Sequence, residues 1–490
     1  MDRQKITESA VKMQTKEDLL TLLNYIKTEE MRESGFAESQ IHPFSIKQLN
    51  YYCNPNHDYD YNHSRYRQFK IKKKSGGFRQ ISAPRNKSFL MLLQATNEIL
   101  KTLYHPPTCA MGFIEGKSVV TNATCHIGKN YVFNIDIKDF FPSISQARVW
   151  KRLQVKPYNL NQQVANLIAG LCSMRVERET IEESAKHEND KKYLYILPQG
   201  APTSPILTNM ICERLDLLLK GLADRFGLYY TRYADDITFS SMHYVYSKNG
   251  EFRKELKRII MEEGFTINDK KTRLQKNGTR KEVTGIIVNE KPNLSYRYLH
   301  DVRNILHIWE RYGYADAVKS FLIRYKREKG HVKKGNPDLI NVMEGKLLYL
   351  KMVKSETDPV YMKLYERFSL LVGKTIAEKN TNSNGTTFIK TWSLPSFEQD
   401  KSYSVVDIKK KEDGKPYASF SIGKVNMTAS VDSKLKCEYF DKKEELAISL
   451  CRGADKKTFY LIHKKKKVNV PQTTSIGELI KNMDSLLNES

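Results

Sequence analysis

The chain has 490 residues and a formal net charge of +25, with 40% hydrophobic and 10% aromatic residues. This length suffices for roughly three domains with cores of their own, and the composition excludes a wholly disordered chain. So large a positive charge repels itself in the compact state. It therefore favours a polyanionic partner such as nucleic acid over a surface that is merely solubilising.

The composition also bears on the compartment. The residues Met1–Lys5 are charged and no apolar segment of a secretory signal follows them. No apolar run approaches the roughly 20 residues that a membrane span needs, so we expect no membrane partner. The 7 cysteines are scattered and form no Cys-x-x-Cys pair. This pattern favours reduced thiols in a cytoplasmic protein over a zinc site or a disulfide framework.

The hydrophobic pattern predicts the elements of the first half of the chain. Residues 1 to about 50 are expected to form amphipathic helix, with apolar positions between Leu19 and Ile26. Strands around a turn are predicted from Tyr66 to Pro84, and helical stretches follow to about Tyr104. Tyr131–Ile137 is apolar enough to be a central strand of a sheet.

The second half begins with a highly charged stretch, residues 175 to 192, which we expect to be an exposed loop or helix. One long helix is predicted from Pro205 to Ala223, and a hairpin from Tyr229 to Ser241 with Asp235 and Asp236 at its tip. Helix is predicted again from about Tyr298 to Val372.

The last hundred residues have a different character. Lys379–Thr387 is rich in Asn, Thr, Ser and Gly and is predicted to be a linker. Beyond it, alternating segments such as Tyr403–Ile408 and Tyr417–Ile422 predict a small β-rich domain.

Carboxylates carry the chemistry. Asp136 closes the apolar strand, and Asp235 and Asp236 occupy the hairpin turn. An Asp-Asp turn alone is more often structural, because aspartate side chains bond nearby backbone. On neighbouring strands, however, three carboxylates would meet and repel one another unless cations neutralised them. Mg²⁺ takes oxygen ligands, and two such ions can promote phosphoryl transfer.

Four segments, in order, match a known family. Tyr233-Ala234-Asp235-Asp236 resembles the Y-x-D-D signature of reverse transcriptases, and Asp136–Ile144 resembles the motif with the first metal-binding aspartate. Leu197–Pro205 resembles the loop beside template and incoming nucleotide. Gly264–Thr272 resembles the motif whose lysine, here Lys271, lies near the triphosphate. The order and the structural setting of the four motifs identify the chain as a member of this family.

Further motifs narrow the resemblance. Asn122–His126 resembles the N-A-x-x-H motif of bacterial retron reverse transcriptases, in which Asn122 and His126 are the named positions, and Val283-Thr284-Gly285 resembles their V-T-G motif. His126 alone would more often be a structural histidine. Together the motifs favour a retron enzyme over a group II intron maturase or a diversity-generating enzyme. The resemblance covers about residues 45 to 372.

The resemblance implies an α+β right-hand polymerase. Residues 1–50 would be an N-terminal helical region, 51–290 the fingers and a palm with an antiparallel sheet, and 291–378 a helical thumb. The resemblance does not reach the remaining residues. There the residue pattern predicts the linker 379–387 and a small C-terminal β-rich accessory domain of unknown function, residues 388–490.

The resemblance also implies roles at the catalytic centre. Asp136, Asp235 and Asp236 would hold two Mg²⁺ ions, with Mn²⁺ as an alternative, and the Ile137 carbonyl would assist. Phe141, five residues after Asp136, would be the steric gate that excludes a ribose 2′-hydroxyl. Considered alone, Phe141 would simply belong to the core.

Other residues would bind the nucleotide and the nucleic acid. Arg79 matches the fingers arginine that clamps the triphosphate, a task suited to a bidentate guanidinium. Gln199 and Gly200 fit a close approach of backbone to the base pair, or an ordinary turn before a helix. The basic region from Tyr298 to Phe368 matches the thumb, which would contact phosphates. The run His463–Lys467 would bind RNA or simply face solvent.

The implied function is RNA-directed DNA synthesis in the bacterial cytoplasm. The partners would be a structured non-coding RNA that serves as template and primer, dNTPs and an attached DNA product. A role in phage defence is implied, often with an effector protein, and a homo-oligomer stays open. Two alternatives remain: a non-retron defence reverse transcriptase with other priming or untemplated synthesis, and a non-catalytic RNA-binding scaffold.

Overall fold

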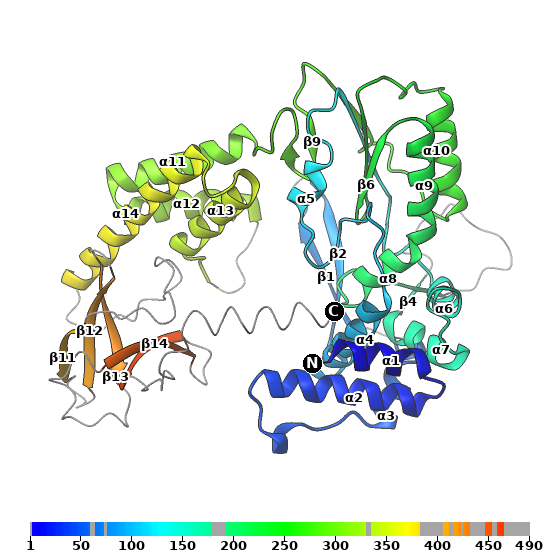
Figure 1. Cartoon of the computed structure of the whole chain (residues 1–490), viewed down its shortest axis with the longest axis horizontal. Coiled ribbons are helices and arrows are strands. Elements are labelled where there is room, and N and C mark those ends of the chain that lie inside the picture. The colour runs from blue at the N-terminus through cyan, green and yellow to red at the C-terminus, as the bar shows by residue number, and fades with distance from the viewer. Residues whose placement is uncertain are drawn as a thin grey trace, which may run out of the picture. The chain divides into compact units, whose positions relative to one another are not determined.

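The computed structural model describes residues 2–58, 64–72, 76–177, 193–329 and 335–382, together with five strands between residues 405 and 464. The chain divides into two units, Met1–Leu364 and Tyr365–Ser490 (Figure 1). The predicted boundary at residues 379–387 therefore lies further along the chain than the division between these units.

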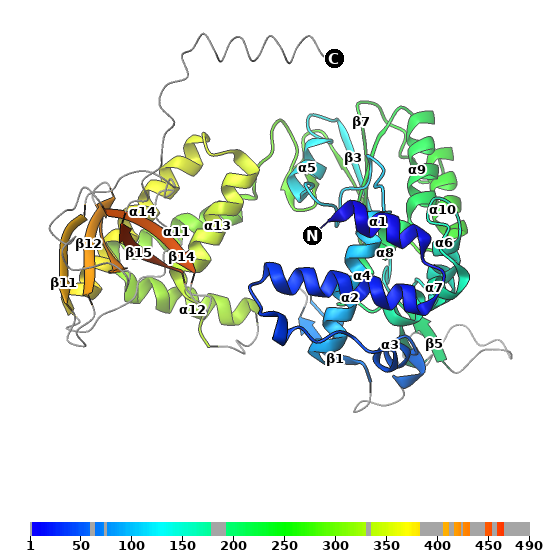
Figure 2. The same ribbon diagram turned by 60° about the horizontal axis from the view of Figure 1, so that its bottom comes forward.

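The N-terminal region is helical, as predicted. It consists of α1 (Arg3–Lys12), α2 (Lys16–Glu33) and α3 (Ile46–Tyr52), with the short 3₁₀ turns η1 (Glu38–Gln40) and η2 (Pro55–His57). A capping box begins α2, because Thr15 and Asp18 each accept the other's backbone N–H. The buried stripe of α2 consists of Leu19, Leu22, Leu23 and Ile26. Both α1 and α2 pack on α4 (Lys87–Leu103) (Figure 2).

A long hairpin precedes α4. Strands β1 (Tyr66–Lys72) and β2 (Phe78–Pro84) pair antiparallel, with Ile71 opposite Arg79. These are the two strands that the sequence predicts between Tyr66 and Pro84. Residues Lys73–Ser75 of the basic turn lie outside the described part of the chain.

The first unit contains a four-stranded antiparallel sheet. Its order is β6 (Tyr229–Tyr233), β7 (Asp236–Ser241), β3 (Tyr131–Asp136) and β8 (Arg273–Lys276). The predicted central strand is confirmed, since β3 lies between β7 and β8. Side chains alternate between the two faces of a strand. On one face, Phe133 and Phe239 pack against Phe252 of α10 (Glu251–Glu262).

Helices flank this sheet. They are α5 (Val119–Thr124), α6 (Gln146–Gln154), α7 (Gln162–Cys172), α8 (Ser204–Ile211), α9 (Glu213–Arg225) and α10. The prediction of one long helix from Pro205 to Ala223 was wrong in one respect. The backbone at Cys212 has a ψ of 0°, and its N–H is shared between the carbonyls of Thr208 and Asn209. This tightened turn separates α8 from α9.

The charged stretch also differs in part from its prediction. Met174–Glu177 is strand β4, paired antiparallel with β5 (Tyr193–Ile196), rather than loop or helix. Met174, the first residue of β4, is buried, whereas Glu177 at its end is exposed. The rest of the stretch, residues 178–192, lies outside the described residues.

Four helices follow a short hairpin. Strands β9 (Glu282–Val283) and β10 (Ile286–Ile287) lead to α11 (Tyr296–Tyr312), α12 (Tyr314–Lys329), α13 (Leu339–Lys354) and α14 (Pro359–Asn382). These helices match the helical region predicted from Tyr298 to Val372. Helix α14 extends to Asn382, so the first part of the predicted linker is helical, and residues 383–387 lie outside the described part.

The second unit contains a five-stranded sheet. Its strands are β11 (Val405–Lys410), β12 (Pro416–Ile422), β13 (Val425–Val431), β14 (Leu446–Arg452) and β15 (Thr458–Lys464). Their order is β11-β12-β13-β15-β14, and the β13–β15 pair is parallel. The two segments predicted as strands fall on β11 and β12, which confirms the β-rich character. Lys465–Lys467 of the basic run lie outside the described residues.

Candidate active site

The sheet register brings the three predicted aspartates together. Asp136, the last residue of β3, is directly opposite Asp236, the first residue of β7. Asp235 lies in the turn directly before Asp236, and Ala234 in the same turn has a left-handed φ of 57°. The N–H of Ile137 donates to the Asp235 carbonyl at 3.0 Å. The prediction that the carboxylates lie on neighbouring strands is therefore confirmed.

The surroundings of Asp235 and Asp236 disfavour negative charge. Burial raises the pKa of Asp235, with the nearby Asp136 adding to the rise. Partial burial raises the pKa of Asp236 to about 6, with the charges of Asp235 and Asp136 adding to the rise, although part of this residue reaches solvent. Lys271 opposes both shifts. An added positive charge would therefore stabilise the ionised carboxylates of this cluster.

Asp136 has two partners from one segment. Its Oδ1 accepts from Asn268 Nδ2 at 2.9 Å, and its Oδ2 accepts from Lys271 Nζ at 2.7 Å. The Asn268 N–H also donates to the Asp136 carbonyl at 2.8 Å. The structure therefore brings the predicted Lys271 to the aspartates. Sequence reasoning gave Asn268 no role, although it stands in the same motif three residues before Lys271.

The donor set fits a hard divalent cation by type. Asp136, Asp235 and Asp236 supply carboxylate oxygens, and their mutual repulsion is what such an ion relieves. Across the described ranges, no three carboxylate, thiol or imidazole side chains already converge as metal ligands. Since Lys271 engages one oxygen of Asp136, a cation at this carboxylate would compete with Lys271.

Three of the predicted nucleotide-binding residues, Arg79, Gln199 and Gly200, lie on β2 or against it. Arg79 is exposed on β2, and its positive charge counteracts the rise in the pKa of Asp235 that burial causes. The Gln199 carbonyl accepts from the Ser82 N–H at 2.8 Å. Gly200 has a φ of 130°, and a Cβ there would lie 2.9 Å from the Ser82 carbonyl oxygen. Glycine is therefore required at position 200 because any side chain there would clash with the backbone of β2.

Phe141 is half-buried and has aromatic neighbours on two sides. Its ring centroid lies 5.6 Å from that of Phe140 and 6.3 Å from that of Phe113. Phe140 belongs to the core. Phe113 is exposed and has a φ of 62°. Sequence reasoning missed Phe113, because neither exposure nor a positive φ can be seen in the pattern of residue types.

The motif histidine is buried in a polar network. His126 Nδ1 lies 2.7 Å from Ser240 Oγ, and Nε2 lies 2.7 Å from Thr231 Oγ1. Thr231 donates its hydroxyl hydrogen to Asn122 Oδ1 at 2.6 Å. It must therefore accept from His126 Nε2–H, which leaves Nδ1 to accept from Ser240. Burial, with Lys129 adding, lowers the pKa of His126 to about 3, so the ring is neutral.

The same network joins the two retron-like motifs. Asn122 Nδ2 donates to Thr284 Oγ1 at 3.4 Å, and Thr284 donates to the Val119 carbonyl at 3.3 Å. Val283 is buried, whereas Gly285 is exposed and has a φ of 85°. The motif residues Asn122, His126 and Thr284 thus meet in space, although a long stretch of chain separates them.

A buried ion pair joins the β6–β7 hairpin to α9, and a hydrogen bond joins the hairpin to α8. Arg232 and Asp216 are both fully buried, with Nη2 and Oδ2 2.6 Å apart. Arg232 Nη1 also donates to Asn209 Oδ1 at 3.1 Å, and Asn209 Nδ2 donates to the Gly112 carbonyl at 2.9 Å. Sequence reasoning missed this set, because its members are scattered along the chain. Removing one partner would leave a buried charge uncompensated.

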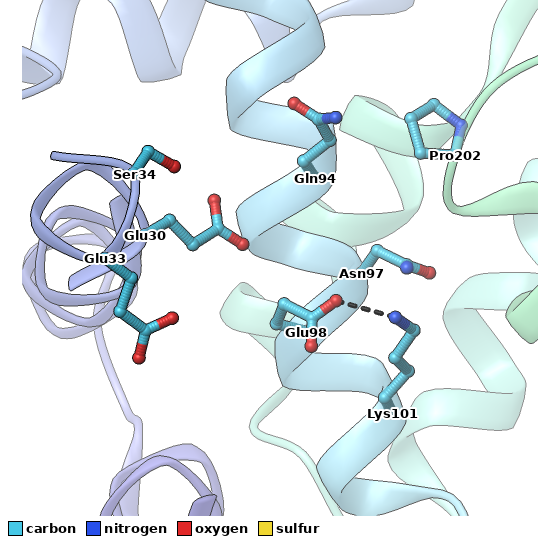
Figure 3. Close-up of a pocket in the computed structure, with 8 residues that line it drawn as sticks. All are labelled: Glu30, Glu33, Ser34, Gln94, Asn97, Glu98, Lys101 and Pro202. Atoms are coloured by element: carbon cyan, nitrogen blue, oxygen red, sulfur yellow. Dashed lines mark hydrogen bonds and ion pairs between the residues drawn. The ribbon is translucent and has the colours of Figure 1, made fainter. Parts of the chain in front are cut away.

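A cavity of about 580 Å³ lies between α2 and α4 (Figure 3). Its lining residues are Glu30, Glu33, Ser34, Gln94, Asn97, Glu98, Lys101 and Pro202. The Lys101 ammonium pairs with Glu98 at 2.7 Å, and burial raises the pKa of Glu30. None of the predicted site residues lines this cavity.

Comparisons with known proteins agree with the motifs. Residues 71–299 match the reverse transcriptase (RNA-dependent DNA polymerase) family. The retron Mx65 reverse transcriptase of Myxococcus xanthus is 37% identical over 242 residues, which are 49% of this chain and 55% of that protein. The retron Ec86 reverse transcriptase of Escherichia coli is 33% identical over 246 residues, 50% of this chain and 69% of that protein.

The chain thus matches about half the length of the Myxococcus relative. Among solved structures, a telomerase from Candida albicans in complex with a fragment of telomeric RNA is similar over 66% of each chain. The identity is 13% and the TM-score is 0.31, a likeness too weak to support any conclusion about this chain.

Proposed function

Because the chain belongs to the retron family of reverse transcriptases, we propose that it is an RNA-directed DNA polymerase that copies a structured non-coding RNA. The observation that carries this proposal is the pairing of Asp136 with Asp236 at the ends of neighbouring strands, with Asp235 in the turn between β6 and β7. A lone Y-x-D-D string would not carry it.

The reaction is attack of a primer hydroxyl on the α-phosphate of a dNTP, with release of pyrophosphate. Asp136, Asp235, Asp236 and the Ile137 carbonyl would hold two Mg²⁺ ions, or Mn²⁺ as an alternative. Such ions activate the attacking hydroxyl and stabilise the leaving oxygen. The chain's own contribution is positioning and charge, which account for most of the catalysis of phosphoryl transfer.

The cations around the carboxylates fit a triphosphate site. Arg79 on β2 is close enough to lower the pKa of Asp235, and the Lys271 ammonium contacts the Asp136 carboxylate. In the proposed reaction both side chains bind phosphate oxygens. The bond from Ser82 to the Gln199 carbonyl fastens the loop of Gln199 and Gly200 to β2. Because Arg79 stands on the same strand, this bond supports a role for the loop in placing Arg79 at the triphosphate, with the loop itself beside the base pair.

Phe141 is proposed to select the sugar. Its half-buried ring packs on the core, and the residue follows the last residue of β3, Asp136, by five positions. A bulky ring at the 2′ position of the nucleotide excludes a ribose hydroxyl by clash, which favours dNTPs.

The wider setting is also proposed from family membership. The net charge of +25 supports binding of a non-coding RNA that serves as template and primer. The DNA product would stay attached to that RNA, and the system would defend a bacterium against phage, with an effector protein. Residues 388–490 are proposed to engage the RNA, the effector or a second copy of the chain, and not to supply catalytic groups.

Primer extension tests the proposal. The purified protein, supplied with an RNA template, a primer, dNTPs and Mg²⁺, should extend the primer, and sequencing of the co-purified nucleic acid should identify one structured RNA with attached DNA. Binding of RNA without extension would instead support the non-catalytic scaffold. Extension without a template, or with unrelated priming, would support a non-retron defence enzyme.

A further inference from the structure

Phe113 is an exposed phenylalanine in an unfavourable backbone conformation. Its side chain is 43% exposed, and its φ of 62° lies in the left-handed region. Bulky side chains rarely adopt this conformation, because the Cβ crowds the backbone. A single exposed apolar residue is common on protein surfaces and needs no explanation. An exposed ring that is also held at a positive φ does need one, since the fold obtains little from it.

The backbone around Phe113 is fastened to the catalytic hairpin. The Met111 N–H donates to the Arg232 carbonyl at 2.8 Å, next to the β6–β7 turn. A Cβ on Gly112 would lie 2.6 Å from the Ala234 nitrogen, so the two backbones are in close contact. Lys117 Nζ donates to the Ala110 carbonyl at 2.7 Å and closes the loop from its other end.

This anchoring decides where the ring lies. Asn209 holds the Gly112 carbonyl, and Asn209 is itself bonded to the buried Arg232. Phe113 therefore follows directly on a segment that is positioned by the same buried side chains as the turn of Asp235. Its position is set by the scaffold of the catalytic hairpin, as expected for a residue with a role at the site.

Phe113 also stands beside the proposed sugar gate. The two ring centroids, of Phe113 and Phe141, are 6.3 Å apart and the ring planes are inclined by 49°. Phe141 comes from the segment after β3, whereas Phe113 comes from the loop before α5. The pair thus presents two neighbouring aromatic side chains, one half-buried and one exposed, from two separate segments of the chain.

We propose that Phe113 contacts the incoming nucleotide, and that its ring forms, with Phe141, the apolar wall against which the sugar and base are placed. This proposal rests on the proposed polymerase function. An aromatic ring suits the contact because every nucleotide offers an apolar face, whatever its sequence. The unfavourable φ is retained because it aims the ring at the substrate.

Single-nucleotide incorporation by three variants tests the proposal. Phe113→Ala and Phe113→Gly should lower kcat/KM for dNTPs by about 5- to 100-fold, mainly through KM, as for the loss of one base–aromatic contact. Phe113→Tyr should stay within about threefold of the unchanged enzyme. Phe36, which is 49% exposed near the end of α2, provides the matched control, and Phe36→Ala should leave kcat/KM unchanged.

The glycine variant separates a binding role from a structural one. Glycine adopts a positive φ freely, so Phe113→Gly should melt at the same temperature as the unchanged protein or higher, while its KM rises. A fall in Tm alongside the fall in kcat/KM would make Phe113 a structural residue and overturn the proposal.

Two further results would also overturn it: an unchanged KM in Phe113→Gly, or an effect confined to the Kd for primer–template. If the unchanged protein extends no primer at all, the proposed polymerase function fails. If the unchanged protein extends a primer and the Phe113 variants have the same kcat/KM, the proposal for Phe113 fails while the proposed polymerase function stands.

Discussion

Two polar clusters lie on the same face of the central sheet, towards opposite ends of β7. Asp236 begins the strand and belongs to the catalytic cluster, whereas Ser240, four residues later, bonds to His126. Residues separated by an even number of positions share a face. In the His126 cluster each ring nitrogen has a hydroxyl partner at 2.7 Å. In the proposed catalytic cluster, burial raises the pKa of both Asp235 and Asp236, and the charge of Asp136 adds to both rises.

The two clusters are therefore expected to have different roles in the same sheet, the His126 cluster in stability and the aspartate cluster in activity. The His126 cluster is neutral and complete without any ligand, as buried polar networks must be if they are to stabilise a fold. The proposed catalytic cluster gathers negative charge, which an added cation would neutralise. Loss of the first should therefore reduce stability, and loss of the second should reduce activity.

The largest expected effect is on catalysis. Asp235→Asn together with Asp236→Asn should reduce primer extension at least about 1000-fold, because two proposed metal ligands lose their charge. The melting temperature should be unchanged or higher, since the variant removes repulsion. Asp224→Asn, at an exposed ion pair with Lys220 on α9, is the matched control and should alter neither quantity. Near-normal extension by the double variant, with normal melting, would exclude the aspartates.

The reverse pattern is expected at His126. His126→Phe keeps an aromatic ring but leaves the hydroxyls of Ser240 and Thr231 without their imidazole partner. We expect a loss of about 2 to 4 kcal/mol in the free energy of unfolding, measured with urea. His243, an exposed histidine bonded to the Phe226 carbonyl, is the matched control, and His243→Phe should change stability by less than about 0.5 kcal/mol. Equal losses for both variants would contradict the distinction.

Sugar selection should show a smaller effect, confined to the catalytic side. Phe141→Ala should lower the preference for dNTPs over ribonucleotides by about 10- to 100-fold, because no ring would oppose the 2′-hydroxyl. The comparison of both nucleotide types in a single-incorporation assay measures this ratio. An active variant whose preference is unchanged would remove Phe141 from that role.

Acid provides the mildest test. The folded-state pKa of His126 is about 3, whereas an unfolded histidine titrates near 6.5. Between these values the unfolded chain binds the extra proton, so the contribution of His126 to stability is complete above about pH 6.5 and declines as pH falls towards 3. The slope is at most about 1.4 kcal/mol per pH unit. The free energy of unfolding of His126→Phe should lack this dependence on pH. If it falls with pH in parallel with that of the unchanged protein, this prediction is wrong.

The sequence was sufficient where the signal is local. The apolar run of β3 and the turn of Asp235 and Asp236 predict their strands by alternation and turn chemistry, and the aspartates accordingly lie where expected. The break at Cys212 was not predictable, because helix-forming residues continue through it. The bond between Asn122 and Thr284 joins residues 162 positions apart, a distance at which a single sequence carries no local signal.

The position of β3 has a consequence for how the chain is made. Both of its partners, β7 and β8, lie later in the sequence, and Asp136 meets Asp236 only about 100 residues after it has been translated. At a synthesis rate of roughly 5 to 20 residues per second, β3 waits about 5 to 20 seconds for β7. During that time an apolar strand has both edges unpaired, a state prone to aggregation. Slow or stalled ribosomes in this interval should therefore lower the yield of folded protein.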